Sequence, residues 1–194
     1  MPRYLGTGTQ WLVIVAVLLL ATIALAATLK SRATIDMPGP AGKRFDYLTI
    51  DYDDHYLLSA HLAAGLLYVI DLRTNKVLKA IPDVPGVEGV EFVPELKKVY
   101  TSDAGDSTIG VIDLKQMKVI KKLPTEAKPD GSAYAAPFHK LYVSEDFPVQ
   151  KKVHSLAVDQ DTHRVYAPEQ EVDGHPAARM TVYEAVTGQT ATLR

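Results

Sequence analysis

The sequence predicts an all-β fold built from repeated four-stranded antiparallel units. The first observation is a period of 42 residues, in which Ile112-Asp113-Leu114 repeats Ile70-Asp71-Leu72 and Tyr142 repeats Tyr100. The second is that four short β-rich runs, separated by turn residues, lie within each period. A period of about 40 residues with four strands per repeat is typical of β-propeller blades.

Length and composition limit the classes of protein to consider. The chain has 194 residues, which is enough for one domain. Its net charge of −2, without any run of basic residues, predicts no nucleic-acid partner. The sequence has no cysteine, which excludes disulfides and a lipidated N-terminal cysteine.

Residues 1–29 are expected to be a signal peptide or a signal anchor. Residues 11–29 carry no charge and lie between Arg3 and Lys30. Such a run is just long enough to cross a bilayer as a hydrophobic helix. Ala24-Leu25-Ala26 has the small-x-small pattern of a cleavage site, which favours removal. Both alternatives place the rest of the chain in the periplasm or outside the cell, and only an uncleaved helix would contact the inner membrane.

Residues 30–44 are predicted to be a linker or a closing strand. Pro38-Gly39-Pro40 is typical of a linker. Residues 33–38, however, resemble the end of a fourth strand such as Lys79-Ala80-Ile81-Pro82. A strand there would cover an otherwise unpaired edge of the last unit. The sequence leaves both alternatives open.

Residues 45–194 are predicted to form a partial propeller, and its first two units are complete. Unit one is expected to have strands at residues 47–50, 56–60, 66–71 and 76–81. Asp53-Asp54 and Thr74-Asn75 supply turn chemistry between them. Unit two repeats this pattern from Val87 to about residue 127.

Unit three is predicted to stop halfway, after strands at residues 131–135 and 141–144. The Ile-Asp-Leu strand due near residue 155 is replaced by Val153-His154-Ser155. These residues begin a last unit, with strands expected at 153–158, 164–166, 180–183 and 189–193 and a longer loop at 168–179. About half a unit is missing near residues 146–153, so about three and a half units should form an open arc or an incomplete ring. Such an arc leaves apolar faces uncovered, and we expect it to self-associate.

Several of these runs resemble the YVTN-repeat (YncE-like) β-propeller family of exported bacterial proteins. The resemblance is carried by residues 44–51, by Leu67-Tyr68-Val69-Ile70-Asp71-Leu72 and by Lys128-Pro129-Asp130-Gly131. Residues 154–159 and 162–166 are similar to the family's closing blade. The resemblance covers roughly residues 34–187 and implies a propeller outside the cytoplasm. Family members usually have more blades, so this chain corresponds to the beginning and the end of such a protein.

The sequence contains no motif of nucleophilic, zinc-dependent or nucleotide-dependent catalysis. Gly-x-Ser-x-Gly, His-Glu-x-x-His, Gly-x-Gly-x-x-Gly and the phosphate loop are all absent. The six histidines are scattered through the chain and are expected to be solvated loop residues.

One set of repeated residues predicts a metal site. Asp46, Glu88 and Asp130 lie 42 residues apart, one per unit, just before the first strand. Alignment of the last unit places His154 at the same position. The first strand of a propeller blade lines the central channel, so these four side chains should converge at its mouth. Carboxylates and an imidazole around one axis could hold a divalent cation or a cationic ligand. The competing interpretation is that acidic residues here cap local turns in water.

A second repeated set is predicted to bind ligand. It occupies equivalent positions after the second strand of each unit, on the same face as the first set, and its members are His61, Asp103, Glu145 and Glu169. Local turn chemistry is again the competing interpretation.

Two functions follow from these sets. The first is an exported binding scaffold that recognises a small molecule or a protein on its channel face. The alternative is a metal-dependent hydrolase of the gluconolactonase type, in which the acidic set holds an ion that activates water. The sequence supplies no distinct general base, so binding is favoured over enzymatic activity.

Overall fold

The computed structural model describes residues 29–41, 44–146, 153–162 and 164–184. In these ranges the chain is all-β, with thirteen strands and three 3-10 helices of three residues each. The predicted N-terminal hydrophobic helix lies outside the described residues. No helix in the described ranges is long and apolar enough to cross a membrane.

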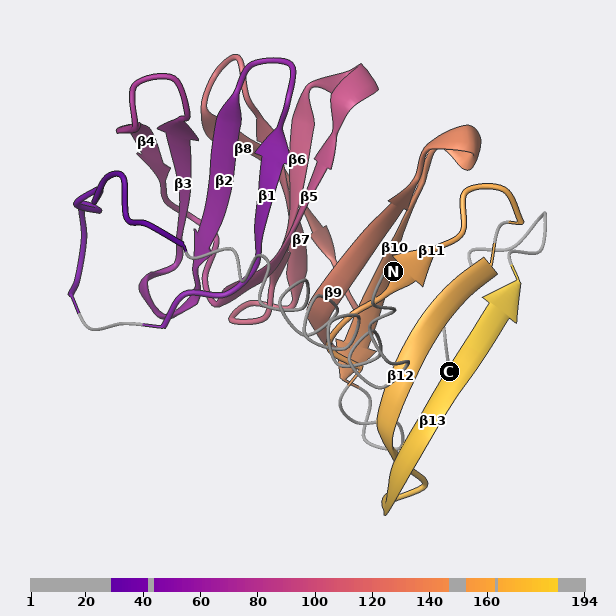
Figure 1. The fold of residues 1–194 in the computed structure, drawn as a ribbon. Coiled ribbons are helices and arrows are strands. Elements are labelled where there is room, and N and C mark those ends of the chain that lie inside the picture. Colours follow the sequence, from indigo (N-terminus) through magenta and orange to yellow (C-terminus); the bar gives the residue numbers. More distant parts are fainter. Residues whose placement is uncertain (1–28, 42–43, 147–152, 163, 185–194) are drawn as a thin grey trace, which may run out of the picture. The chain divides into compact units, whose positions relative to one another are not determined.

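The strands form four antiparallel sheets, each built from consecutive strands, as the repeat predicts (Figure 1). The first sheet contains β1 (Leu48–Asp51), β2 (Tyr56–His61), β3 (Leu66–Asp71) and β4 (Lys76–Ile81). The second contains β5 (Val87–Val93), β6 (Lys98–Asp103), β7 (Thr108–Asp113) and β8 (Lys118–Pro124). The third has only β9 (Lys128–Ala135) and β10 (Lys140–Asp146). The fourth has β11 (Ala157–Val158), β12 (Arg164–Val172) and β13 (His175–Glu184).

The 42-residue period is visible in the backbone dihedral angles of the residues directly before the strands. Residues with positive φ precede the second, third and fourth strands of the units, and they recur at the same spacing: His55, Lys97 and His139; Gly65 and Ser107; Asn75 and Met117. Short 3-10 helices follow the first strands of the second and third sheets, at η2 (Pro94–Leu96) and η3 (Ala136–Phe138). A further one, η1 (Leu62–Ala64), joins β2 to β3. A left-handed residue ends a turn and returns the chain antiparallel, so these positions fix the hairpin geometry of each unit.

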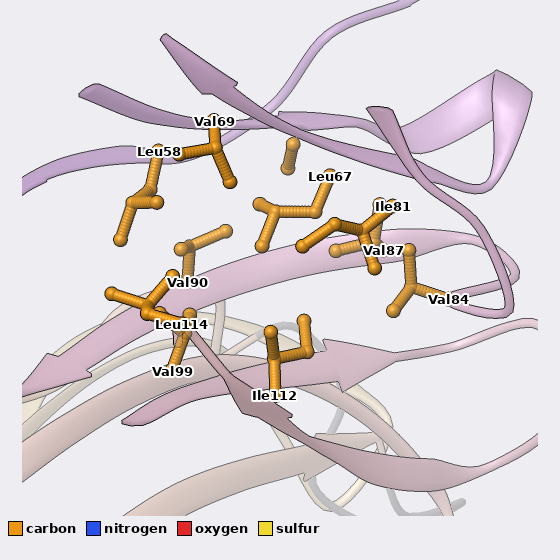
Figure 2. Packing of buried hydrophobic residues seen from close by; sticks show 11 residues of the cluster. Leu58, Leu67, Val69, Ile81, Val84, Val87, Val90, Val99, Ile112 and Leu114 are labelled. Carbon is orange, nitrogen blue, oxygen red and sulfur yellow. The ribbon is translucent and has the colours of Figure 1, made fainter. Parts of the chain in front are cut away.

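The hydrophobic core lies between the first two sheets. Figure 2 shows their side chains pointing toward one another. The period-2 alternation of strands puts every second residue on this face. Its buried residues are Leu58, Ala60, Leu67, Val69 and Ile81 from the first sheet, Val84 from the connection, and Val87, Val90, Val99, Ile112 and Leu114 from the second sheet and the turn after β7.

The first strands of successive sheets contact one another in series. β1 contacts β5, β5 contacts β9, and β9 contacts β11. This arrangement brings the starts of the four units together, and the candidate site lies there.

The N-terminal segment covers the other face of the first sheet. Tyr68, fully buried in β3, donates a hydrogen bond to the carbonyl oxygen of Pro38. The ring of Phe45 stacks on His61 with centroids 4.0 Å apart. Tyr68 and His61 alternate with the core residues along their strands, so they lie on the opposite face. The chain's own segment therefore covers the part of this face around Tyr68 and His61, whereas Leu48, on the same face of β1, is 61% exposed.

Three expectations need correction. The closing-strand alternative is not formed, because residues 29–41 contain no strand. The strand expected at residues 153–158 is limited to Ala157–Val158. The longer loop expected at residues 168–179 is instead most of a long hairpin, β12–β13, which turns at Asp173-Gly174 with φ values of 50° and 77°. Asp-Gly is a strong hairpin signal, but Pro168 and Pro176 suggested a loop.

Candidate functional site

The predicted first set of residues comes from all four units. Asp46 lies just before β1, Glu88 and Asp130 lie near the starts of β5 and β9, and His154 lies before β11. The serial contact of the first strands brings these positions to one junction. We call Asp46, Glu88, Asp130 and His154 the junction cluster.

Asp130 and His154 form a hydrogen-bonded pair in the junction cluster. Nδ1 of His154 lies 2.5 Å from Oδ2 of Asp130, whose side chain is only 8% exposed. Burial raises the pKa of Asp130, while hydrogen bonds from Glu88 and His154 act in the opposite direction. The imidazole thus compensates for part of the cost of burying this carboxylate.

Glu88 carries the most perturbed carboxyl group of the cluster. Burial raises its pKa to about 7, and a hydrogen bond with Asp130 and the negative charges of Asp130 and Asp46 act in the same direction. The nearby Arg44 lowers it by a smaller amount. Two adjacent carboxyl groups in a poorly solvated place share a proton rather than ionise together. At neutral pH the Glu88–Asp130 pair therefore holds a proton for much of the time.

Arg44 and Tyr47 also belong to this site, and sequence reasoning missed both. Nη2 of Arg44 forms an ion pair with Oδ2 of Asp46 at 2.5 Å. The hydroxyl of Tyr47 donates to the carbonyl oxygen of His154, which links the first unit to the last. Burial, and then the charges of the three carboxyl groups, raise the pKa of Tyr47. Arg44 lies two residues before Asp46 and Tyr47 directly after it, and this proximity was the signal that could have identified them.

Glycine allows the backbones of the first strands to come this close. A Cβ at Gly89 would lie 2.5 Å from the carbonyl oxygen of Asp130, and one at Gly131 would lie 2.5 Å from that of His154. Both distances are below any normal contact, so only glycine fits without a shift of the backbone. The pairs Glu88-Gly89 and Asp130-Gly131, one period apart, combine the acidic residue with this close approach.

The cluster is not arranged as a preformed metal site. Among the described residues, no three histidine, aspartate or glutamate side chains are grouped so that they could hold a metal ion. Asp46 is paired with Arg44 and Asp130 with His154, so these carboxylates already have cationic or hydrogen-bonding partners. Glu88 interacts with Asp130 and Asp46, and Asp130 with His154. A shared site of all four residues and its divalent cation stay predictions.

Each residue of the second predicted set bonds to residues outside the set. His61 Nδ1 lies 3.0 Å from the hydroxyl of Tyr68 in the adjacent strand. Asp103, fully buried, accepts a hydrogen bond from Lys122 at 3.0 Å, and burial raises its pKa to about 6. These side chains turn into the sheet instead of toward a channel.

The other two members of this set behave alike. Glu145 accepts a hydrogen bond from the backbone N–H of Ala127 at 2.9 Å. Glu169, buried in β12, pairs with Arg179 of β13 at 2.6 Å and accepts a longer hydrogen bond from Tyr183. Throughout the described ranges, no hydrogen bond or ion pair joins one member of the set to another. Its role in ligand binding stays a prediction.

The fold and the junction cluster define an all-β repeat protein with blade-like antiparallel sheets. The fold is similar to a chain of the Kuenenia stuttgartiensis hydrazine synthase, with a TM-score of 0.65 and 16% sequence identity. The match covers 77% of this chain and 49% of that one, so the chain spans about half the length of its structural neighbour. At this identity the likeness shows the fold alone. No family model and no curated protein matches the chain.

Proposed function

We propose that this chain is an exported repeat protein of the β-propeller type that binds a ligand or a protein outside the cytoplasm. The observation that carries the proposal is the junction cluster, in which four units contribute one polar side chain each to a partly buried place around Asp130. Stability alone seldom favours the burial of neighbouring carboxyl groups, and perturbed groups of this kind concentrate at functional sites.

The propeller type is supported by the order of the contacts. Each sheet consists of consecutive antiparallel strands, and the first strand of each contacts the first strand of the next. Blades arranged around an axis have these two properties. Sheets of four, four, two and three strands in the described ranges favour an open arc of about three and a half units.

The same repeat is the evidence for the proposal that the chain belongs to the YVTN-repeat family. The Ile-Asp-Leu motifs end β3 and β7 of equivalent units, and the positive-φ residues recur at their period. The family's general character, an exported propeller, agrees with the apolar segment at residues 11–29.

Export rests on that segment, and a reporter tests it. Residues 1–40 fused to an enzyme active only in the periplasm should give activity, and a silent reporter would contradict export. Mass analysis of the exported full chain then distinguishes cleavage after Ala26 from retention as an anchor.

The chemistry of the cluster favours a ligand with a cationic group. A cation at Glu88 and Asp130 would replace the proton that the two carboxyl groups share, so binding should strengthen as the pH rises through about 7. Nothing in the described residues favours the lactonase alternative, which stays a prediction.

Thermal unfolding with two probe cations, calcium and spermidine, tests this ligand class. We expect either cation to raise the melting temperature of the full chain more at pH 8 than at pH 6. Glu88→Gln should reduce the rise, whereas Glu126→Gln, at an exposed residue outside the cluster, should not. Equal responses in the two variants would contradict a cation site at the cluster.

A further inference from the structure

Among the described residues β10 is an edge strand, at a place where the equivalent strands are paired on both sides. β2 pairs with β1 and β3, and β6 pairs with β5 and β7. In the described ranges β10 pairs only with β9. Its residues Leu141 and Val143 are half-buried, whereas their counterparts one period earlier, Val99 and Thr101, are 0% and 1% exposed. β10 therefore lacks the cover that a third strand gives.

The second sheet shows what a third strand at β10 must look like. There the antiparallel register places Asp113 opposite Lys98 and Ile112 opposite Val99. Lys140 is the counterpart of Lys98, and its side chain is exposed. The missing strand should thus carry an apolar residue opposite Leu141, followed by an acidic residue opposite Lys140.

The chain contains such a segment outside its sheets. Ile35-Asp36-Met37 has the pattern of Ile112-Asp113-Leu114, and it belongs to no strand. Asp36 is exposed, while Ile35 and Met37 on either side are half-buried. In the register of the second sheet, Thr34 and Ala33 would then lie opposite Tyr142 and Val143.

The segment cannot reach β10 of its own chain. Pro38 accepts the hydrogen bond of Tyr68 in the first sheet, and the second sheet lies between the first and the third. Sheets pack about 10 Å apart, so β10 is on the order of 20 Å away. The three residues from Pro38 to Ile35 span at most about 11 Å.

We propose that β10 takes its third strand from a second copy of this chain, residues 33–37, paired antiparallel with Asp36 opposite Lys140. The exchange is reciprocal, because each copy offers one free β10 edge and one free segment. It yields a two-fold dimer in which both third sheets gain a strand. The exposed acid–base pair sets the register, and the main-chain hydrogen bonds supply most of the affinity. This partner is additional to the ligand proposed for the junction cluster, and neither proposal depends on the other.

Cysteine cross-linking between different variants tests the exchange. The full chain has no native cysteine, so each introduced thiol is the only one. Opposed residues of an antiparallel pair have Cα atoms about 4.5–5.5 Å apart, within reach of a disulfide. Asp36→Cys and Lys140→Cys proteins, mixed in excess detergent micelles so that the apolar segment does not gather copies, should form a mixed disulfide dimer. A pair of single variants can be joined only between copies.

The matched control is Lys98→Cys, which stands one period earlier on a strand already paired on both sides. We expect several-fold more mixed dimer from the Asp36→Cys and Lys140→Cys proteins than from the Asp36→Cys and Lys98→Cys proteins. Equal yields, or no mixed dimer from variants with native circular dichroism, would overturn the proposal. Cross-linking of Lys140→Cys only to a protein of another sequence would also overturn the second copy as partner.

A charge exchange gives an independent measurement. Asp36→Lys and Lys140→Asp should each reduce the dimer fraction in light scattering, because like charges then face each other. A mixture of the two variants should form heterodimers, because both reciprocal junctions then join opposite charges. Unchanged dimer fractions in both single variants would contradict the proposed register.

Discussion

The first two sheets and the last two sheets differ in how completely their strands are paired. The first two have four strands each and enclose a buried core, whereas the last two have two and three strands in the described ranges. Exposure follows this difference: Leu67 in β3 is 0% exposed, while Met180 and Val182 in β13 are 56% and 50% exposed. A repeat unit is stabilised by its neighbours, so incomplete units should contribute little to the cooperative stability of the chain.

Removal of a core side chain should show the largest difference between the two halves. Leu67→Ala leaves a cavity between two complete sheets and should lower the free energy of unfolding by about 2–5 kcal/mol. Leu141→Ala, at a half-buried position of β10, should cost about 1 kcal/mol. Urea unfolding followed by circular dichroism measures both. Similar losses would mean that the third sheet is as well packed as the first.

Close approach of the backbones gives the next largest effect. Gly89→Ala introduces a Cβ between two paired sheets, next to Asp130 and to the hydroxyls of Ser102 and Ser132, and should cost about 1–3 kcal/mol. Gly131→Ala meets residues 154–155, which are not in a sheet and can shift more easily, so its cost should be smaller. The same urea experiment compares them, and a larger loss for Gly131→Ala would reverse the ranking of the two junctions.

The junction cluster predicts a pH dependence. The pKa of Glu88 is raised from 4.5 to about 7, so the folded state binds more protons than the unfolded state between these values. The stability from this group is complete below pH 4.5 and is lost as the pH rises through about 7. Glu88→Gln should flatten this decline, with more gain at pH 8 than at pH 5. Asp103, whose pKa is raised to about 6, leaves part of the slope in place. If Glu88→Gln leaves the pH dependence of stability unchanged, the proton must bind to another group.

The smallest effects should come from side chains that join neighbouring hairpins. Nζ of Lys97 bonds to Asp53 and Asp54 of the preceding unit at 3.0 Å and 3.2 Å. In the later half, the amide of Gln160 bonds to the backbone of Tyr134 and Ala136. Lys97→Met and Gln160→Ala should each lower the stability of the chain only slightly. High salt should reduce the effect of Lys97→Met only, and a salt-insensitive loss there would assign its role to packing on Phe92.

The repeat could be predicted from sequence because one hairpin geometry recurs with the same spacing. The strands of the first two units and the halt of the third follow from motifs such as Ile70-Asp71-Leu72, whose alternation fixes which face is buried. The last unit was predicted less well, because Pro168 and Pro176 are atypical of strands and lie on either side of the Asp173-Gly174 turn. Proline is tolerated on edge and irregular positions of a strand, and β12 and β13 shift register between Glu169 and Glu171.

The two predicted residue sets show how far the spacing of residues along the sequence can predict the site. Equivalent positions at the starts of first strands converge because those strands contact one another, so Asp46 and Asp130 were found from spacing alone. Whether residues at the equivalent ends of second strands meet depends on the direction of each side chain. The side chains of Asp103 and Glu169 form ion pairs with Lys122 and Arg179 of their own sheets. Spacing along the sequence carries no information on that choice, and it also gives no sign of the contact from Tyr47.

The recurrence of left-handed residues at equivalent turns has a consequence for how the chain could be lengthened. His55, Lys97 and His139 differ in chemistry but share one backbone conformation, as do Asn75 and Met117. A duplicated copy of residues 88–129, inserted after Pro129, would carry its own left-handed turn residues, Lys97, Ser107 and Met117, at the same spacing. Recombination at the ends of this segment therefore adds or removes a whole unit together with its turns. Arcs of different length are accessible to this sequence by gene duplication, and the conformation of the turns is inherited with each copy.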